Sequence, residues 1–268
     1  GASGIGTALL NAYAEAGAKV LIVSDINLRG AEEVARHLEA TYKGVKAVAI
    51  LTDVGSEDSI VELVEYVETE HGPIGMFAAN AGVIGDLSEF GGGVDISEEV
   101  WMAKIRINFL QHAWVAKHLI PRYIGRVGQD QGGHILITAS AAGLLTQIGS
   151  ATYAATKSAA VAMAEWLAVT YSSRGVGVSC LCPQAVDTPM TQYGPGVAGV
   201  DGMMQPDEVA QITVEAQRQG KFLVLPHKEV AVYIKRKAGD VDRWLSGMVR
   251  LQDRFAESMG LYTPKAKL

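Results

Sequence analysis

Residues 1–6 read "GASGIG", a glycine-rich turn in which Gly1, Gly4 and Gly6 precede an apolar segment with helical spacing. Glycine permits tight backbone geometry in such a turn and lets a pyrophosphate approach the amide groups at the start of the following helix. The turn alone is a weak signal, because many glycine-rich turns only redirect the chain. It gains weight from Asp25, which follows the apolar run "KVLIVS" about 20 residues later, the spacing of a carboxylate that binds an adenosine ribose.

The remaining sequence alternates short, continuously apolar runs with longer amphipathic segments. Runs that are apolar at every position are typical of strands buried on both faces, and intervening helices are typical of right-handed parallel crossovers. We therefore predict a single α/β domain over residues 1–268, a doubly wound parallel sheet in a Rossmann-type three-layer sandwich. The predicted strands are 19–24, 46–51, 76–79, 134–138, 177–182 and 222–225. The predicted helices are 4–16, 28–41, 56–71, 98–122, 151–174 and one from 228 towards 257.

Composition excludes several classes of function. The 268 residues carry a net charge of -6 and 49% hydrophobic residues, so the chain can bury a large core and has no basic surplus for nucleic acid. No apolar run is long enough to span a bilayer. Cys180 and Cys182 are too close to bridge easily and are predicted to be buried free thiols. The six histidines have no metal-ligand spacing, so we predict no metal site.

A second group of residues suggests acid–base chemistry. Tyr153 and Lys157 are four positions apart on a predicted helix and share a face, which lets an ammonium group stabilise a tyrosinate. Such a tyrosine could exchange a proton with an alcohol. Ser140, just past the strand "HILIT", could donate to the substrate oxygen. Taken singly, each feature has an ordinary alternative: a helix-surface pair for the first two and a turn residue for the third.

Several separated motifs occur together and in order, so that the chain resembles the classical short-chain dehydrogenases/reductases over almost its whole length. They are the turn at 1–6, Asp25, "TDV" at 52–54, "NAG" at 80–82, Asn108 in "RINF", Ser140, "YAATK" at 153–157 and "PQAVDTPM" at 183–190.

The resemblance implies roles for individual residues. The catalytic residues would be Asn108, Ser140, Tyr153 and Lys157, with Asn108 in a water-linked proton relay to Lys157. Asp53 would reach the adenine, and Val186 and Thr188 the nicotinamide carboxamide. The complete set expected at the cofactor is Gly1, Ser3, Gly4, Ile5, Gly6, Asp25, Asp53, Val54, Asn80, Ala81, Gly82, Tyr153, Lys157, Pro183, Val186 and Thr188.

Two departures from the family pattern affect these expectations. Gln184 stands where the family has a glycine, so a side-chain-bearing residue must make that turn. The family's motif begins with Thr-Gly two residues before Gly1, preceded by a central first strand, whose loss would leave neighbouring strands with unpaired amides. We expect the sequence to be a fragment of a longer enzyme, with an inactive variant as the alternative.

The predicted function is an NAD-dependent oxidoreductase that interconverts a secondary alcohol and a ketone. Asp25 would repel a 2'-phosphate, which favours NAD over NADP. The segment 188–220 is expected to form a lid over the substrate, and it carries Met190, Tyr193, Met203 and Met204. These side chains suit an apolar substrate, such as a steroid, fatty-acyl or aromatic alcohol, or they simply pack the lid onto the core. The alternative is a non-catalytic or fragmentary dinucleotide-binding protein of the same fold.

Oligomeric state and compartment are further expectations. The resemblance implies a homodimer or homotetramer joined through helices 98–122 and 151–174. We expect a cytoplasmic protein, with peroxisomal import through the C-terminal Ala266-Lys267-Leu268 as the alternative.

Overall fold

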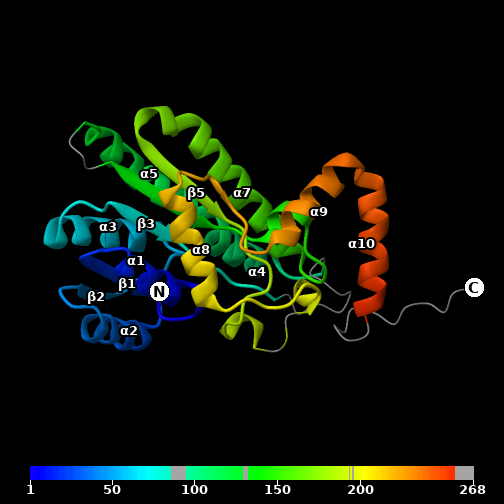
Figure 1. The fold of residues 1–268 in the computed structure, drawn as a ribbon, viewed down its shortest axis with the longest axis horizontal. Coiled ribbons are helices and arrows are strands. Elements are labelled where there is room, and N and C mark those ends of the chain that lie inside the picture. The colour runs from blue at the N-terminus through cyan, green and yellow to red at the C-terminus, as the bar shows by residue number, and fades with distance from the viewer. Residues whose placement is uncertain (86–94, 129–131, 193, 195, 257–268) are drawn as a thin grey trace, which may run out of the picture.

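The computed structural model describes residues 1–85, 95–128, 132–192, 194 and 196–256, and its elements alternate along the chain as the sequence predicts (Figure 1). The strands are β1 (Val20–Asp25), β2 (Lys46–Leu51), β3 (Met76–Ala79), β4 (Gly133–Thr138), β5 (Val176–Leu181) and β6 (Leu223–Val224). The helices are α1 (Gly4–Glu15), α2 (Leu28–Thr41), α3 (Glu57–His71), α4 (Glu98–Ile105), α5 (Gln111–Gly125), α6 (Ala141–Leu145), α7 (Ala151–Tyr171), α8 (Pro206–Arg218), α9 (Lys228–Gly239) and α10 (Val241–Phe255).

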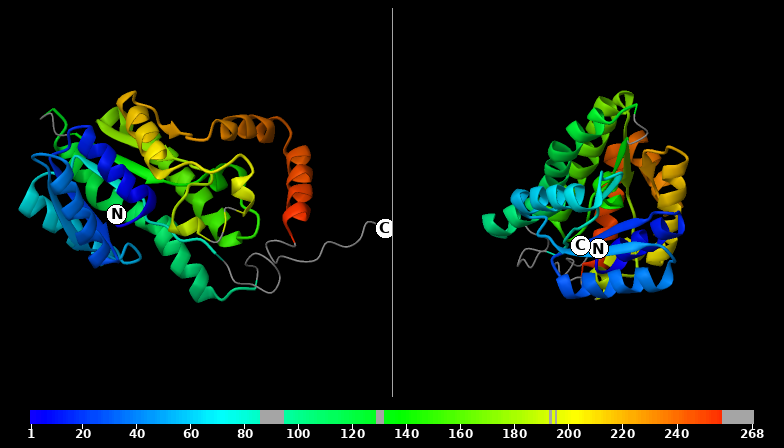
Figure 2. Two further views of the ribbon diagram at one scale, coloured as in Figure 1. Left: turned by 60° about the horizontal axis from the view of Figure 1, so that its bottom comes forward. Right: turned by 90° about the vertical axis from the view of Figure 1, so that its left-hand side faces the viewer.

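All pairings between these strands are parallel, and helices cover both faces of the sheet (Figure 2). In β4, Leu136 packs in the core that α1 and α8 form with the sheet. Its neighbours Ile135 and Ile137 pack on the opposite side, against α3, α5 and α7. Because successive residues of a strand point to opposite faces, the unbroken apolar run of β4 reflects burial on both sides. The prediction of a doubly wound Rossmann-type α/β fold is confirmed.

The sheet is divided between β1 and β3. β1 pairs with β2 in one sheet, and β3-β4-β5-β6 follow one another in the other; no described strand pairs β1 with β3. A cavity of about 440 Å³ lies between them, lined by Leu21 of β1, Phe77 of β3, Leu9 of α1 and Val115 of α5. The sequence predicts unpaired neighbouring strands at this place, and residues of α1, α3 and α5 line the cavity together with those of β1 and β3.

Two predicted helices are each divided by a local change in the backbone. Within 98–122, residues Arg106–Leu110 form a π-helical turn between α4 and α5. Within 228–257, Asp240 adopts an extended conformation (φ -160°, ψ 96°) and caps α10 by accepting a hydrogen bond from the Arg243 amide. Asp240 therefore ends α9 and starts α10, which leaves in a new direction (Figure 2).

The segment 188–220 contains α8, which sequence analysis did not predict. Its residues Val209, Ala210 and Val214 are buried against Leu9 and other residues of α1. The second half of this segment is therefore part of the domain core, and its first half, before α8, is the part that can cover a ligand.

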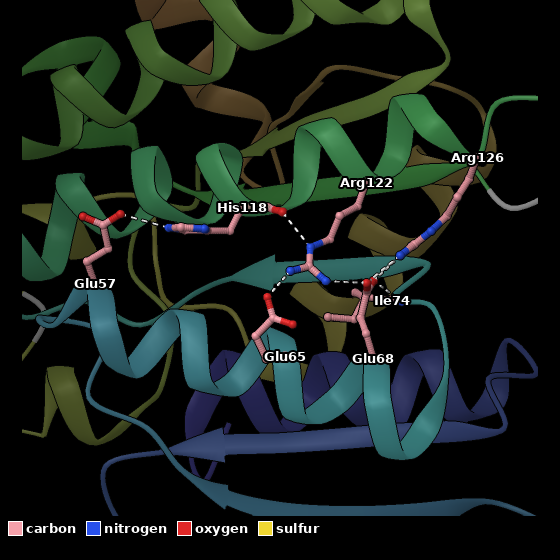
Figure 3. Close-up of polar contacts among 7 residues, drawn as sticks. All are labelled: Glu57, Glu65, Glu68, Ile74, His118, Arg122 and Arg126. Carbon is pink, nitrogen blue, oxygen red and sulfur yellow. Dashed lines mark hydrogen bonds and ion pairs between the residues drawn. The ribbon is translucent and has the colours of Figure 1, made fainter.

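An ion-pair network fixes α3 against α5 (Figure 3). Glu68 accepts hydrogen bonds from Arg122 at 2.9 Å, from Arg126 at 2.5 and 2.6 Å, and from the Ile74 amide at 3.1 Å. Burial acts to raise the pKa of Glu68, but these hydrogen bonds outweigh it and lower the pKa. Arg122 also pairs with Glu65, so both arginines have carboxylate partners.

Other sequence predictions concern membranes, metals and the C-terminus. Among the helices of the described residues, none has the length and apolar character needed to cross a membrane. The described residues also contain no cluster of three or more metal-ligating side chains. Cys180 and Cys182 are buried free thiols, as predicted. Ala266-Lys267-Leu268, the basis of the peroxisomal alternative, lie outside the described residues.

Candidate active site

The predicted site residues lie at the carboxyl ends of five parallel strands. Asp25 ends β1, Asp53 follows β2, Asn80 follows β3, Ser140 follows β4 and Pro183 follows β5. The carboxyl ends of parallel strands meet at one edge of the sheet, which is where open α/β folds bind ligands. The fold thus brings together residues that are up to 158 positions apart in sequence.

Ser140 and Tyr153 meet at this edge. Ser140 caps α6, where its Oγ atom accepts the Ala142 amide at 3.1 Å, and its side chain lies near that of Tyr153. Tyr153 is only 9% exposed. Burial raises the pKa of Tyr153 above its usual value, and the nearby Ser140 hydroxyl acts to lower it. The neutral phenol is therefore the resting form in this structure.

Lys157 lies one helical turn after Tyr153, with its Nζ atom 5.7 Å from the centroid of the tyrosine ring. The side chain is 2% exposed, and Nζ donates to the carbonyl of Thr138 at 2.9 Å. Burial lowers the pKa of Lys157 to about 8. A lysine with that pKa can take up and release a proton near neutral pH.

Asn108 lies in the π-helical turn and is completely buried. Its Oδ1 atom accepts the Val83 amide at 2.8 Å, and its Nδ2 atom donates to the Val83 carbonyl at 2.9 Å and to Thr156 Oγ1 at 3.1 Å. A Cβ atom on Gly82 would lie 3.2 Å from Lys157 Nζ and 3.3 Å from Asn108 Oδ1. Glycine at position 82 therefore leaves room where Asn108 and Lys157 converge.

The glycine turn packs tightly against residues from distant segments. Gly4 has φ of 53°, and a Cβ there would lie 2.9 Å from Thr188 Cγ2. A Cβ on Gly6 would lie 3.2 Å from Asn80 Nδ2. Ser3, at the N-cap of α1, makes no side-chain capping bond, which leaves the first amides of the helix for an anionic ligand.

The turn is also linked to Asp25. The Oδ2 atom of Asp25 accepts the Ala2 amide at 2.9 Å, and Oδ1 accepts the Asn27 amide at 2.9 Å. Burial acts to raise the pKa of Asp25, but these hydrogen bonds lower it. Asp25 is therefore an ionised carboxylate beside the glycine turn.

The remaining expected cofactor residues lie around the same edge. Asp53 is exposed and accepts the Gly55 amide at 2.8 Å, and Val54 is half-buried beside it. The carbonyl of Ala81 accepts a hydrogen bond from Gln111 at 2.7 Å. Ile5 lies in the first turn of α1 and is half-buried.

The segment after β5 makes its turn without strain. Gln184 has no positive φ, and it donates from its amide to His227 Nδ1 at 3.1 Å and from Nε2 to Asp201 at 2.9 Å. His227 Nε2 lies 3.0 Å from the carbonyl of Ala185, so the imidazole bridges two consecutive backbone groups. Sequence analysis missed His227, since no local pattern links it to residues 183–186.

Ser140 and Tyr153 line one end of a cavity of about 1060 Å³. Met190 lines it as expected, whereas Met204 packs in the core and Met203 does not line it; Tyr193 lies outside the described residues. Sequence analysis missed the contribution of α9 and α10. These helices project from the body of the domain, with α10 at the far side of this region (Figure 1), and supply the cavity-lining residues Tyr233, Lys235, Arg236, Arg243, Trp244, Met248, Arg250, Leu251 and Arg254.

These features fit a nicotinamide dinucleotide. The glycine turn and the open helix N-terminus suit a pyrophosphate, and the ionised Asp25 suits a ribose. The Oδ1 atom of Asn80 is buried without a hydrogen-bond partner among the described residues, and the Nδ2 atom of the same side chain lies beside Gly6 of the turn. The residues present therefore match the group that the motifs predict.

Comparison with known proteins agrees with this reading. A family model described as short chain dehydrogenase matches residues 1–195. The 1-deoxy-11-beta-hydroxypentalenate dehydrogenase of Streptomyces exfoliatus is 32% identical over 247 residues, which cover 91% of this chain and 87% of that protein. The cis-4-hydroxycyclohexanecarboxylate dehydrogenase of Sinomonas cyclohexanicum is 31% identical over 252 residues, which cover 94% and 92%.

Solved structures show the same fold. A short chain dehydrogenase/reductase from Burkholderia phymatum in complex with NAD has a TM-score of 0.79 at 24% identity, covering 90% of this chain and 91% of that one. A short-chain dehydrogenase from Sphingobium yanoikuyae in complex with NADPH has a TM-score of 0.76 at 21% identity, covering 91% and 92%. With a family model that spans most of its length and relatives above 30% identity, the chain belongs to the short-chain dehydrogenase family.

Proposed function

We propose that the protein is an NAD-dependent oxidoreductase that interconverts a secondary alcohol and a ketone. The observation that carries this proposal is that Ser140 and Tyr153 line the cavity of about 1060 Å³, while the Nζ atom of Lys157 lies 5.7 Å from the centroid of the tyrosine ring. The names of its relatives, which are dehydrogenases of hydroxylated compounds, support the same reaction class.

In this mechanism Tyr153 exchanges the proton of the substrate hydroxyl. When bound, a nicotinamide dinucleotide supplies the hydride acceptor or donor, and its oxidised ring adds positive charge to the site. Ser140, which lines the cavity with Tyr153, holds the substrate oxygen within reach of the phenol. Because burial raises the pKa of Tyr153, the tyrosinate needs the nearby ammonium of Lys157 for stabilisation.

Lys157 also links Tyr153 to the interior of the protein. Its pKa of about 8 allows it to replace the proton that Tyr153 gives up. Asn108 lies next to Lys157 across Gly82, and we propose that this side chain continues the proton path. Its hydrogen bonds to both backbone groups of Val83 hold it in place.

Asp25 supports NAD as the cofactor. The carboxylate ends β1, is held ionised by amide donors and lies beside the glycine turn. A fixed negative charge there accepts hydrogen bonds from ribose hydroxyls and repels a 2'-phosphate. Solved structures of the same fold contain NAD or NADPH, so the choice for this chain depends on its own Asp25.

The cavity supports an apolar substrate. Its walls include Leu145, Ile148, Val197 and Met190. Relatives include dehydrogenases named for hydroxypentalenate, hydroxycyclohexanecarboxylate and 3beta-hydroxysteroids, all of them cyclic alcohols. We therefore propose a cyclic secondary alcohol with a mainly hydrocarbon skeleton.

Replacing Tyr153 by Phe tests the proposed function. Calorimetry would measure binding of NADH and NADPH, and absorbance would follow reduction of NAD by cyclic secondary alcohols. We expect Tyr153→Phe to bind NADH as the parent does and to lose turnover. Activity retained by this variant would refute the mechanism, and a parent protein that binds NADH without turnover would favour the non-catalytic alternative.

The oligomer and the compartment are also proposals. Trp166 and Val169, on one face of α7, are 54% and 86% exposed, which suits a homo-oligomer joined through this helix. The cytoplasm is the proposed compartment.

A further inference from the structure

The cavity lined by Tyr153 also has a wall formed by α9 and α10. This wall is rich in basic side chains, unlike the apolar wall described above. Five basic side chains line the cavity: Lys235, Arg236, Arg243, Arg250 and Arg254. Two acidic side chains, Asp201 and Asp240, line it as well. The wall therefore has a surplus of three positive charges in a chain whose net charge is -6.

Both acidic side chains are engaged within the protein. Asp201 accepts hydrogen bonds from Tyr233 Oη at 2.8 Å and from Gln184 Nε2 at 2.9 Å. Asp240 caps α10 through the Arg243 amide at 2.9 Å. Their oxygens are thus directed to a phenol, an amide side chain and a backbone amide, and within the described part of the chain neither carboxylate is hydrogen-bonded to a guanidinium group of the cavity.

The four arginines of this wall have no ion-pair partner among the residues that the structure describes. Among the described residues, no carboxylate oxygen lies within 4.0 Å of a guanidinium nitrogen of Arg236, Arg243, Arg250 or Arg254. By contrast, Arg122 and Arg126 elsewhere in the fold are paired with Glu68. The donors at the cavity are therefore available to an anionic ligand.

The geometry of α10 places these donors on one side of the helix. Arg243, Arg250 and Arg254 follow at intervals of seven and four residues, which keeps them on a common face. Gly247 lies between them on the same face and also lines the cavity, so the wall is open there. Next to this arginine face, Trp244 and Met248 form an apolar face that packs towards the domain.

We infer that the substrate carries a carboxylate in addition to the hydroxyl that reacts, and that Arg243, Arg250 and Arg254 bind this carboxylate. The inference rests on the proposed function, since it places the reacting hydroxyl at Tyr153 and the acid at α10. The apolar residues between these two ends would contact the hydrocarbon skeleton. Guanidinium groups form paired hydrogen bonds with carboxylates, which gives both affinity and orientation.

The test compares hydroxy acids with their methyl esters. The probes are hydroxycyclohexanecarboxylate as a short substrate and lithocholate as a long one, each beside its methyl ester, with NAD as oxidant. For the acid of the preferred length we expect a kcat/KM about tenfold or more above that of its ester. We also expect the KM of the acid, but not of the ester, to rise with salt concentration.

Substitution assigns the effect to the arginines. Arg250→Gln and Arg243→Gln should each raise the KM of the acid several-fold and leave the ester unchanged. Arg218→Gln is the matched control, because Arg218 is an exposed helix arginine that does not line the cavity. Equal kcat/KM for acid and ester, or equal losses for both in the variants, would overturn the inference while the proposed function stands.

A binding measurement separates the two proposals. Calorimetry in the presence of NADH would compare cyclohexanecarboxylate with cyclohexanecarboxamide, its neutral counterpart. Absence of turnover with all probes would count against the proposed function, and stronger binding of the acid than the amide, lost in Arg250→Gln, would still support the carboxylate site. Equal binding of acid and amide would overturn it.

Discussion

The ammonium group of Lys157 lies 5.7 Å from the ring centroid of Tyr153 and donates to the carbonyl of Thr138 at 2.9 Å. The lysine is thus held in place by the end of β4 while it faces the tyrosine from the same helix. Burial lowers its pKa to about 8, so the surroundings destabilise the charged form, which nevertheless still predominates at pH 7. Such an arrangement is costly for stability and therefore points to a role in function.

Replacing Lys157 by Met separates the effect of this lysine on turnover from its effect on stability. We expect turnover to fall by about 100-fold or more because Tyr153 loses its stabilising charge. The free energy of unfolding should not decrease, because a buried ammonium is replaced by an apolar side chain of similar length. Urea titration and initial rates would measure both quantities, with Lys43→Met at an exposed position as control. A large loss of stability would instead indicate a structural role.

Gly82→Ala tests the close approach of Asn108 and Lys157. The added Cβ would lie 3.2 Å from Lys157 Nζ and 3.3 Å from Asn108 Oδ1, so we expect the lysine to shift by a few tenths of an ångström and kcat to fall about tenfold. Gly75→Ala is the control, because a Cβ there would have no neighbour within 4 Å. Equal activity in the two variants would show that the position of the lysine is not critical.

Asp25→Asn tests the choice of cofactor. Removing the negative charge while keeping the size of the side chain should lower the ratio of the NADPH to the NADH dissociation constant about tenfold. Calorimetric titration of both dinucleotides would measure this ratio. Asp58→Asn, at an exposed position of α3, should leave the ratio unchanged. If Asp25→Asn also leaves it unchanged, another residue selects the cofactor.

We expect the stability of the fold to depend on pH through the buried imidazole of His112. Burial, together with the charge of Lys157, lowers its pKa from 6.5 to about 3. Between these values the unfolded chain binds a proton that the folded protein excludes, so stability is fully present above about pH 6.5 and decreases as the pH falls. At about pH 5 this one residue should reduce the free energy of unfolding by about 2 kcal/mol.

The measurement for His112 is urea unfolding at about pH 7.5 and about pH 5. His112→Phe should lose less stability between these conditions than the parent does. His37→Gln, at an exposed position of α2, should behave as the parent. An unaltered pH dependence in His112→Phe would show that other groups, such as His227, dominate.

We expect copies of the chain to associate through the face of α7 that carries Trp166. Trp166 is 54% exposed on α7, with Val169 one turn further at 86%. Light scattering should give the mass of a dimer or tetramer for the parent and a smaller assembly for Trp166→Glu. Tyr66→Glu, an exposed aromatic position on α3, is the control. A parent of monomer mass would contradict the prediction.

Several features of the fold could be predicted because they depend on residues close together in sequence. The apolar run of β4 requires two buried faces, and the four-residue spacing of Tyr153 and Lys157 requires a common helix face, whatever the rest of the chain does. The position of Asp25 could be predicted because it follows the glycine turn by about 20 residues and ends the intervening strand. Boundaries of α2 and β2 were also predicted correctly, since each coincides with a change in periodicity.

Other features depend on contacts that no local pattern encodes. The π-helical turn at Asn108 forms where its side chain bonds Val83 and Thr156, 25 and 48 positions away. His227 reaches the backbone of Gln184 from 43 positions away.

The sequence by itself determined the α/β class, the family and the set of residues at the carboxyl ends of the strands, because periodicity and motif spacing are local properties. Only the tertiary structure decided which surfaces form the cavity. Arg243, Arg250 and Arg254 read as an ordinary solvated helix face until Asp240 redirects the chain and Trp244 and Met248 pack α10 against the domain. The direction of a helix relative to a distant site is set by its capping and by long-range packing, and these arise only when the chain is folded.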